Sequence, residues 1–245
     1  MDRILTCRLL PHSEASGPLN MARDEVLLER AVEGVASLRF YGWSEPTVSL
    51  GYFQSHHHVL EDPDLKQLGW VRRASGGDAL VHHHEVTYAL ALPPGRDWQS
   101  GELWQRMHQV IVNALSQLGV KAYLFEPQTE DDFSGSLCYE HFTIGDVMID
   151  NHKIVGSAQR KQKKAILQHG GVLLQQSVHT PTLPGIHELS QVNVSPSALI
   201  EQLTSGLIKL TGWRLEPSDW IEQEAQRADE LVEMKYGTER WNKKR

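Results

Sequence analysis

The segment from Val147 to Val155 places the strongest constraint on the fold, because it has the pattern of a β-hairpin. Val147-Met148-Ile149 and Ile154-Val155 have strand composition, and Asp150-Asn151-His152 between them has turn composition. Asn accepts a positive φ more readily than most residues, which suits a tight turn. The pattern therefore predicts a hairpin whose return strand begins at Lys153.

Cys138 lies upstream of this hairpin, in the polar loop sequence DDFSGSLCYEHF. A thiol attacks as its thiolate, and a free thiol has a pKa of roughly 8.5, so an ammonium held nearby raises the reactive fraction at neutral pH. Lys153 could meet the thiol across the hairpin. The pair therefore indicates acyl transfer through a thioester, with Cys138 as nucleophile and Lys153 as the cation that activates it.

A structural role for this cysteine is the alternative, since a single cysteine is more often a buried apolar residue than a nucleophile. The polar loop around Cys138 favours the catalytic interpretation, because reactive groups tend to lie on loops. Cys7, in the apolar run ILTCRLL, is the cysteine that we expect to pack inertly.

The chain of 245 residues can bury one large core, and we expect a single domain over residues 1–245 with no accessory C-terminal domain. No apolar run approaches the roughly 18 residues of a membrane span, and no apolar signal segment follows the charged start. We therefore expect a cytoplasmic protein, and a reducing compartment suits a free thiol. The formal charge of −7 argues against a general nucleic-acid binder.

Helical and strand patterns alternate along the chain. Further strands are expected at residues 4–10, 38–43, 47–53 and 86–92. Helices are expected at residues 27–35, 62–68, 100–118, 199–210 and 221–232. The order indicates a mixed β-sheet with flanking helices, in the α/β or α+β class.

Two arginines followed by paired glycines, Arg72-Arg73 and Gly76-Gly77, form a second candidate site. Paired glycines let backbone amides approach a ligand carbonyl or phosphate closely. The arginines could hold an anion or brace the loop through its carbonyls, and the residues alone leave both roles open. The segment does not match a P-loop, because no Gly-Lys-Ser or Gly-Lys-Thr ends it.

Two histidine runs, His56-His57-His58 and His82-His83-His84, and the basic run from Arg160 to Lys164 are also notable. On a strand, His82 and His84 would share a face, but the sequence names no third ligand, so we expect surface or packing histidines and no metal. The basic run is typical of a solvated strand or loop end, and it could also dock an acidic partner protein.

The motifs together resemble the lipoate–protein ligase and octanoyltransferase superfamily, which also includes biotin–protein ligase. RRASGG followed by His82, DVMIDNHKIVGSAQR and LQHGGVLL carry the resemblance, and Lys153 to Ala158 with His169-Gly170 is its most specific part. A helix start at Asn20-Met21-Ala22, a strand end at residues 50–54, and the closing Lys235-Tyr236 with Trp241-Asn242 are also similar to the family and extend the resemblance over nearly the whole chain.

The resemblance implies a mixed-sheet catalytic domain of the biotin/lipoate protein ligase type, which binds a medium-chain acyl group. It assigns substrate binding to Arg72, Arg73, Ser75, Gly76, Gly77, His82, Gly156, Ser157, Ala158, His169 and Gly170. Asp78 departs from the family, which usually has Gly or Arg there, and this departure weakens an anion-binding role for the loop.

The position of Cys138 upstream of Lys153 resembles one octanoyltransferase branch of the superfamily. Another branch has its cysteine just before the His-Gly pair, where this chain has Ala165 to Gln168. The resemblance then implies an octanoyl acyl carrier protein as donor and a lysine of a lipoyl domain or glycine-cleavage H protein as acceptor, with no cofactor. Thioester exchange is near balance and amide formation from a thioester is downhill, so this route needs no ATP.

Three alternatives stay open. The first is an ATP-dependent lipoate–protein ligase that uses ATP and magnesium, although Gly145 stands where ligases tend to have Asn. The second is an amidotransferase that moves octanoyl between two lipoyl-bearing proteins with the same nucleophile. The third is an inactive carrier-binding module, which the joint presence of Cys138, Lys153 and the Gly-Gly loop disfavours.

Overall fold

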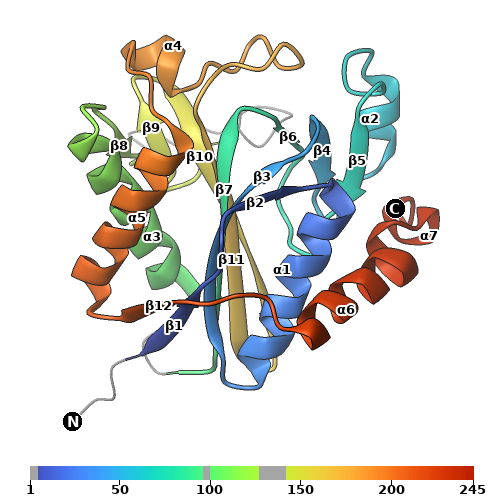
Figure 1. Ribbon diagram of the computed structural model, residues 1–245. Coiled ribbons are helices and arrows are strands. Elements are labelled where there is room, and N and C mark those ends of the chain that lie inside the picture. The colour runs from blue at the N-terminus through green and yellow to red at the C-terminus, as the bar shows by residue number, and fades with distance from the viewer. Residues whose placement is uncertain (1–4, 96–99, 127–141) are drawn as a thin grey trace.

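One mixed β-sheet forms the centre of the computed structural model, which describes residues 5–95, 100–126 and 142–245. Its strand order is β12-β1-β3-β7-β11-β10-β9-β8, and β2 pairs with β3 (Figure 1). The strands are β1 (Thr6–Leu9), β2 (Ser13–Ala15), β3 (Ala36–Trp43), β7 (Glu85–Leu92), β8 (Tyr123–Leu124), β9 (Val147–Ile149), β10 (His152–Gln162), β11 (Ala165–Leu173) and β12 (Arg214–Pro217). A second, smaller sheet has the order β5-β4-β6, from β4 (Thr47–Leu50), β5 (Gly69–Arg72) and β6 (Leu80–His82).

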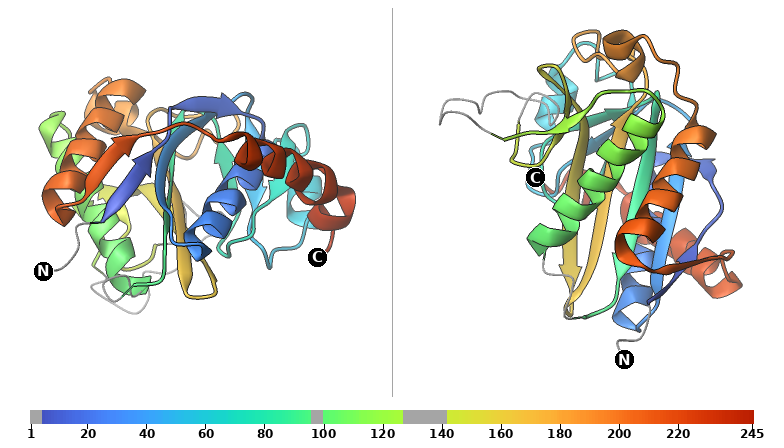
Figure 2. Two further views of the ribbon diagram at one scale, coloured as in Figure 1. Left: turned by 60° about the horizontal axis from the view of Figure 1, so that its bottom comes forward. Right: turned by 90° about the vertical axis from the view of Figure 1, so that its left-hand side faces the viewer.

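Helices cover both faces of the main sheet (Figure 2). On one face lie α3 (Ser100–Gln117) and α5 (Pro196–Thr211), and on the other lie α1 (Gly17–Val32) and α6 (Glu222–Leu231). The shorter helical elements are α2 (His57–Glu61), α4 (Ile186–Ser190), the π-helical turn η1 (Val232–Tyr236) and α7 (Glu239–Asn242). None of the described helices is long and apolar enough to cross a membrane.

The central strands are buried on both faces, and the size of the side chains on each face sets how closely a helix can approach it. On β7, Leu90 and Leu92 belong to the core under α3 and α5, whereas Ala89 and Ala91 belong to the core under α1. Successive side chains of a strand point to opposite faces. The small residues therefore let α1 approach the sheet closely, beside the segment that carries His169 on β11.

The predicted hairpin is present, and its details differ from the prediction. The return strand β10 begins at His152, one residue earlier than expected, because His152 pairs with Ile149. The positive φ of the turn falls on Asp150, at 48°, rather than on Asn151. The register shifts between Lys153 and Val155, which locally disrupts the ladder beside Lys153.

The helical segment expected at residues 62–68 is present only as a turn, in which the Lys66 amide donates to the Asp62 carbonyl oxygen at 3.0 Å, and no α-helix is formed there. The helix α2 ends at Glu61, and the Asp62 carboxylate accepts hydrogen bonds from the backbone amides of Asp64 and Leu65. These are the contacts of an N-cap residue, so the sequence correctly places a helical turn here, although the turn does not extend into an α-helix. The strand β6 ends at His82, so His82 and His84 do not share a strand face.

Candidate active site

Lys153 lies in a cavity of about 280 Å³ between the Gly76-Gly77 loop and the strand β10. Its Nζ atom is 2.7 Å from Oδ2 of Asp146, which precedes β9, and both side chains are buried. The cavity is lined by Gly76, Gly77, Asp78, Trp104, Thr143, Asp146, Lys153, Ser157, Ala158 and Gln159. The hairpin therefore presents one buried cation, already paired with a carboxylate, to this cavity.

The two carboxylate oxygens of Asp146 differ in their hydrogen bonding. Its Oδ2 accepts from Lys153 and from the backbone amide of Thr143, whereas its Oδ1 is buried without a hydrogen-bond partner among the described residues. Burial raises the pKa of the Asp146 carboxyl above its usual value, and the Lys153 charge partly offsets this. Asp146 is therefore a buried carboxylate with one oxygen available to accept a proton.

The Gly76-Gly77 loop packs tightly against the end of β4. A Cβ atom at Gly51 would lie 1.7 Å from the carbonyl oxygen of Gly77, so only glycine fits there. Gly77 itself has a φ of +89°, in the left-handed region. Arg73 donates to the carbonyl oxygens of Ser49, Gly76 and Asp78, which fixes the loop against the smaller sheet.

Arg72 is fully buried, and its guanidinium donates to backbone carbonyl oxygens of Gly51, Gln54 and Asn242. These hydrogen bonds of both arginines are those of a loop brace, which is one of the two roles that the sequence left open. Arg73 also lines an apolar pocket, whereas Arg72 lines none of the three pockets around the site.

Ser157 on β10 joins a directed chain of hydrogen bonds. His108 of α3 donates from Nδ1 to the carbonyl oxygen of Gly145 at 2.6 Å, because a carbonyl can only accept. Burial lowers the pKa of His108 to about 4, so the ring is neutral and Nε2 is the acceptor, which receives the Ser157 hydroxyl at 2.6 Å and the Trp104 indole N–H at 2.9 Å. Tyr88 then donates to Ser157 at 2.7 Å, and the amide of Gln168 donates to Tyr88 at 2.8 Å.

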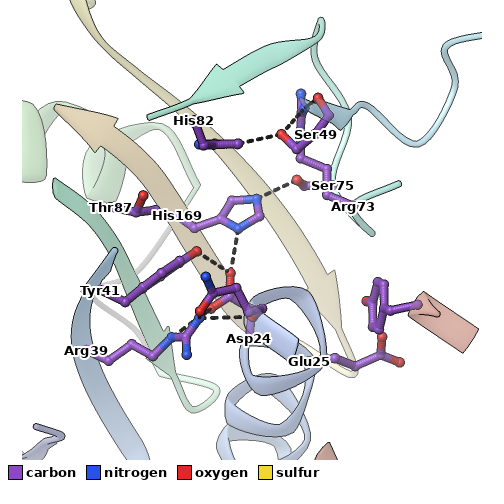
Figure 3. A network of polar contacts seen from close by, with 12 residues as sticks. Asp24, Glu25, Arg39, Tyr41, Ser49, Arg73, Ser75, His82, Thr87 and His169 are labelled. Atoms are coloured by element: carbon purple, nitrogen blue, oxygen red, sulfur yellow. Dashed lines mark hydrogen bonds and ion pairs between the residues drawn. The ribbon is translucent and has the colours of Figure 1, made fainter. Parts of the chain in front are cut away.

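His169 on β11 joins a second network, with Ser75 and Asp24 (Figure 3). Its Nε2 lies 2.6 Å from the Ser75 hydroxyl, and its Nδ1 lies 2.8 Å from Oδ2 of Asp24. Asp24, on α1, also accepts from Arg39 and Tyr41 of β3. The network fixes the ring of His169 in the wall between two pockets, because His169 lines both.

The first of these pockets is narrow and mainly apolar, with a volume of about 40 Å³. His82 lies in its wall, where its ring stacks on Trp43 at 3.8 Å and its Nε2 contacts the Ser49 hydroxyl. Its lining is Met21, Tyr41, Trp43, Ser49, Arg73, Gly77, Leu80, His82, Thr87, Gly156, Ser157, Ala158, His169, Gly170 and Gly171. Gly77, Ser157 and Ala158 also line the cavity of Lys153, so the two spaces adjoin.

Most of the predicted substrate-binding residues therefore gather around three adjoining spaces, and Cys138 lies outside the described residues. Sequence reasoning missed four participants: Asp24, Tyr88, His108 and Asp146. The sequence did contain a signal for Asp146, because this residue follows Gly145 directly before the hairpin. The sequence contained no signal for His108, because this residue lies among the apolar residues of the predicted helix.

Comparison with known proteins identifies the family of the chain. Residues 16–202 match the lipoyl protein ligase A/B catalytic domain. Octanoyltransferase LipM of Anoxybacillus flavithermus is 30% identical over 97% of this chain and 98% of its own length. Octanoyltransferase LipM of Geobacillus kaustophilus is 31% identical over 92% of this chain and 94% of its own length.

Solved structures show the same fold. Lipoate-protein ligase A bound with ATP has a TM-score of 0.81 at 22% identity, with 98% of this chain and 99% of that chain covered. A bi-partite lipoate protein ligase from Thermoplasma acidophilum has a TM-score of 0.75 at 21% identity, with 98% and 97% covered. At these identities the likeness concerns the fold alone.

The chain belongs to the family of lipoyl protein ligase A/B catalytic domains. Within that family it belongs with the octanoyltransferases named LipM, which are acyltransferases. The family resemblance and the mixed-sheet fold predicted from the sequence are confirmed.

Proposed function

We propose that this protein transfers an octanoyl group from an acyl carrier protein, through a thioester on Cys138, to a lysine of a lipoyl domain or glycine-cleavage H protein. The observation that carries the proposal is the match, over nearly the whole chain, to relatives named octanoyltransferase. The cavity around Lys153 supports it, because a buried ammonium beside a glycine loop suits a reaction that develops negative charge on oxygen.

The first step exchanges one thioester for another. The Cys138 thiolate attacks the octanoyl carbonyl, the new carbon–sulfur bond forms, and the bond to the carrier's thiol breaks. The carrier's thiolate then takes up a proton. Lys153 would donate a hydrogen bond to the carbonyl oxygen while it carries negative charge.

The second step forms the amide. The neutral amine of the acceptor lysine attacks the octanoyl carbonyl, the carbon–nitrogen bond forms, and the Cys138 thiolate leaves. The nitrogen must lose a proton in this step. Asp146 would accept it, because its Oδ1 is buried without a hydrogen-bond partner among the described residues and its carboxyl faces the cavity of Lys153.

The apolar pocket between Trp43 and Ala158 would hold the octanoyl chain, since it opens beside the cavity of Lys153 and its walls are mainly apolar. In this arrangement Ser157 and Ala158 lie where the acyl chain and the reacting carbonyl meet. Gly170 lets β10 approach closely, because a Cβ atom there would lie 2.4 Å from the Ser157 hydroxyl oxygen and 2.5 Å from the Gly156 carbonyl oxygen. A cytoplasmic location belongs to this proposal, since a catalytic thiol works in a reducing compartment.

The decisive experiment is the intact mass of the protein after mixing with octanoyl carrier in the absence of ATP. One octanoyl mass should appear on Cys138, and hydroxylamine should remove it. Cys7→Ala is the matched control, because Cys7 is fully buried and burial raises the pKa of its thiol to about 12. Acylation should persist in Cys7→Ala and disappear in Cys138→Ala, and transfer at the parent rate by Cys138→Ala would exclude covalent catalysis.

A further inference from the structure

A set of polar residues lies in the wall of the apolar pocket, where the smaller sheet meets the main sheet. Ser49 belongs to β4, His82 ends β6, and Glu85 begins β7. His82 Nε2 lies 2.7 Å from the Ser49 hydroxyl oxygen (Figure 3), and His82 Nδ1 lies 2.7 Å from Oε1 of Glu85. All three side chains are buried, and Ser49 and His82 line the pocket. None of the three takes part in the bond-making steps proposed for octanoyl transfer.

The hydrogen bonds of this set have one consistent direction. A carboxylate can only accept, so His82 donates from Nδ1 to Glu85. Arg73 donates from Nη1 to the Ser49 hydroxyl oxygen at 3.2 Å, which leaves the hydroxyl hydrogen for Nε2 of His82 when the imidazole is neutral. The hydroxyl therefore donates to a histidine that a carboxylate orients. This is the arrangement of a serine nucleophile, its general base and the group that holds the base.

Neighbouring side chains hold the base and its carboxylate in place. The His82 ring stacks on Trp43, with 3.8 Å between the ring centroids. The Trp43 indole donates to Thr87 at 2.9 Å, and the Thr87 hydroxyl donates to Oε1 of Glu85. Gly171 leaves room for the carboxylate, because a Cβ atom there would lie 2.9 Å from Oε1 of Glu85. The imidazole is therefore fixed in its orientation toward the hydroxyl.

The network is not optimised for stability. Buried polar groups of a structural network normally all have hydrogen-bond partners. Here Oε2 of Glu85 is buried without a partner among the described residues, and such an oxygen lowers the free energy of unfolding. The Ser49 side chain also borders a pocket rather than a closed core. The joining of two sheets is therefore an incomplete explanation of these contacts.

We propose that Ser49, His82 and Glu85 form a second reactive centre, which hydrolyses short acyl esters and thioesters. The pocket has a volume of about 40 Å³ and mainly apolar walls, so it admits a short acyl group whose carbonyl reaches the Ser49 hydroxyl. The leaving alcohol or thiol lies in the adjoining cavity of about 280 Å³ around Lys153. A longer acyl chain fills the pocket and keeps its carbonyl beside that cavity, out of reach of Ser49.

The reaction has two steps. In the first, Ser49 Oγ attacks the acyl carbonyl, a carbon–oxygen bond forms, and the hydroxyl proton passes to His82 Nε2. The bond to the alcohol or thiol then breaks, and His82 returns the proton to that leaving group. In the second, water attacks the acyl-serine with His82 again as the base, the carboxylic acid is released, and Ser49 recovers its proton. Arg73 supplies a positive charge beside the developing oxyanion, since its Nη1 lies 3.2 Å from Oγ.

The test is covalent labelling of Cys138→Ala with a small alkyl fluorophosphonate, which reacts with activated serines and expels fluoride. The intact mass should show one adduct, and peptide mapping should place it on Ser49. Adding Glu85→Gln should slow the labelling by about a hundredfold or more, because an amide can hold the ring in the wrong tautomer. The matched control is Ser37→Ala, which removes another buried serine, on β3, and should leave the labelling rate unchanged.

Ester hydrolysis is the second measurement. Cys138→Ala should hydrolyse p-nitrophenyl acetate faster than p-nitrophenyl octanoate, and adding Ser49→Ala should reduce acetate hydrolysis to the rate without enzyme. A folded Cys138→Ala protein that gains no adduct on Ser49 would overturn the proposal, and so would equal hydrolysis with and without the Ser49 hydroxyl. Labelling needs no variant of Ser49, so it decides the matter even if Ser49→Ala does not fold. Every arm contains Cys138→Ala, so the outcome is independent of octanoyl transfer through Cys138.

Discussion

Lys153 is a member of an ion pair, which changes what a substitution there measures. The sequence predicted a cation that acts on Cys138, and the structure adds Asp146 at 2.7 Å as its partner. Removing one member of a buried pair leaves the other charge without compensation, which typically costs about 3–5 kcal/mol. A loss of activity in a single Lys153 variant therefore mixes catalysis with stability.

Lys153→Met should be less stable than the parent by about 3 kcal/mol at neutral pH. Burial raises the pKa of Asp146, and without Lys153 that pKa rises further. The folded variant then binds a proton at a pH where the unfolded chain does not, so its deficit should shrink as the pH falls toward about 4. Urea denaturation at several pH values measures this, and a pH-independent deficit would contradict the assignment.

The double variant Lys153→Met with Asp146→Asn separates the two effects. It contains neither charge, so most of the lost stability should return. Acylation of Cys138 should stay slow, and the lower limb of its pH profile should move upward, because the ammonium that favours the thiolate is absent. Parent-like acylation in the double variant would show that Lys153 has a structural role alone.

Lys153 was predictable and its partners were not, for a physical reason. The lysine follows a local turn signal, and the spacing of a hairpin is encoded by neighbouring residues. The contacts of Ser157 with His108 and of His169 with Asp24 join residues 49 and 145 positions apart. Such pairs depend on how helices dock on the sheet, which local patterns do not encode.

At the scale of elements, the hydrogen-bond chain through Ser157 ties α3 to three strands. It runs from Gln168 on β11 to Tyr88 on β7, then to Ser157 on β10 and His108 on α3. Every proton in it has a fixed direction, because the Gly145 carbonyl at its end can only accept. The chain depends on a neutral His108 ring.

Protonation of His108 should therefore destabilise the fold. Its pKa is lowered from 6.5 to about 4, so the unfolded chain binds a proton between these values and the folded chain does not. Stability from this residue is fully present above pH 6.5 and is lost as the pH falls toward 4, by about 3 kcal/mol in total. In His108→Gln, the free energy of unfolding, measured by thermal or urea denaturation, should decline less as the pH falls from 6.5 toward 4. The exposed control His12→Gln should decline as the parent does. An identical decline in parent and His108→Gln would show that His108 is not held neutral in the folded protein.

The elements themselves were largely predictable where periodicity was long. The helix after Ser100 and the strands β3 and β7 follow from repeated apolar spacing. The helix α1 begins at Gly17, near the helix start that the family resemblance gave at Asn20 and well before the apolar pattern that starts at Leu27. Periodicity missed its first half because polar residues such as Asn20 and Asp24 are buried there. Asp24 contacts His169 of the site, so a polar residue is buried where periodicity expects an apolar one.

At the scale of the whole molecule, three adjoining spaces surround the loop that Arg73 braces. The apolar pocket shares Gly77, Ser157 and Ala158 with the cavity of Lys153, and it shares Met21 and His169 with the pocket beyond His169. An acyl chain in the apolar pocket would therefore place its carbonyl beside the cavity of Lys153. Such an arrangement suits both a transferase with a tethered donor and a ligase with a nucleotide.

The requirement for ATP distinguishes these two functions. A ligase must form an acyl-adenylate, so its activity with free octanoate or lipoate requires ATP and magnesium and releases pyrophosphate. A cysteine transferase needs neither, because its thioester donor is already activated. We expect transfer from octanoyl carrier to a lipoyl-domain lysine in the presence of a chelator, with no gain on adding ATP. The measurement is the mass of the lipoyl domain together with released pyrophosphate. Lipoylation from free lipoate that needs ATP and survives Cys138→Ala would replace the transferase by the ligase.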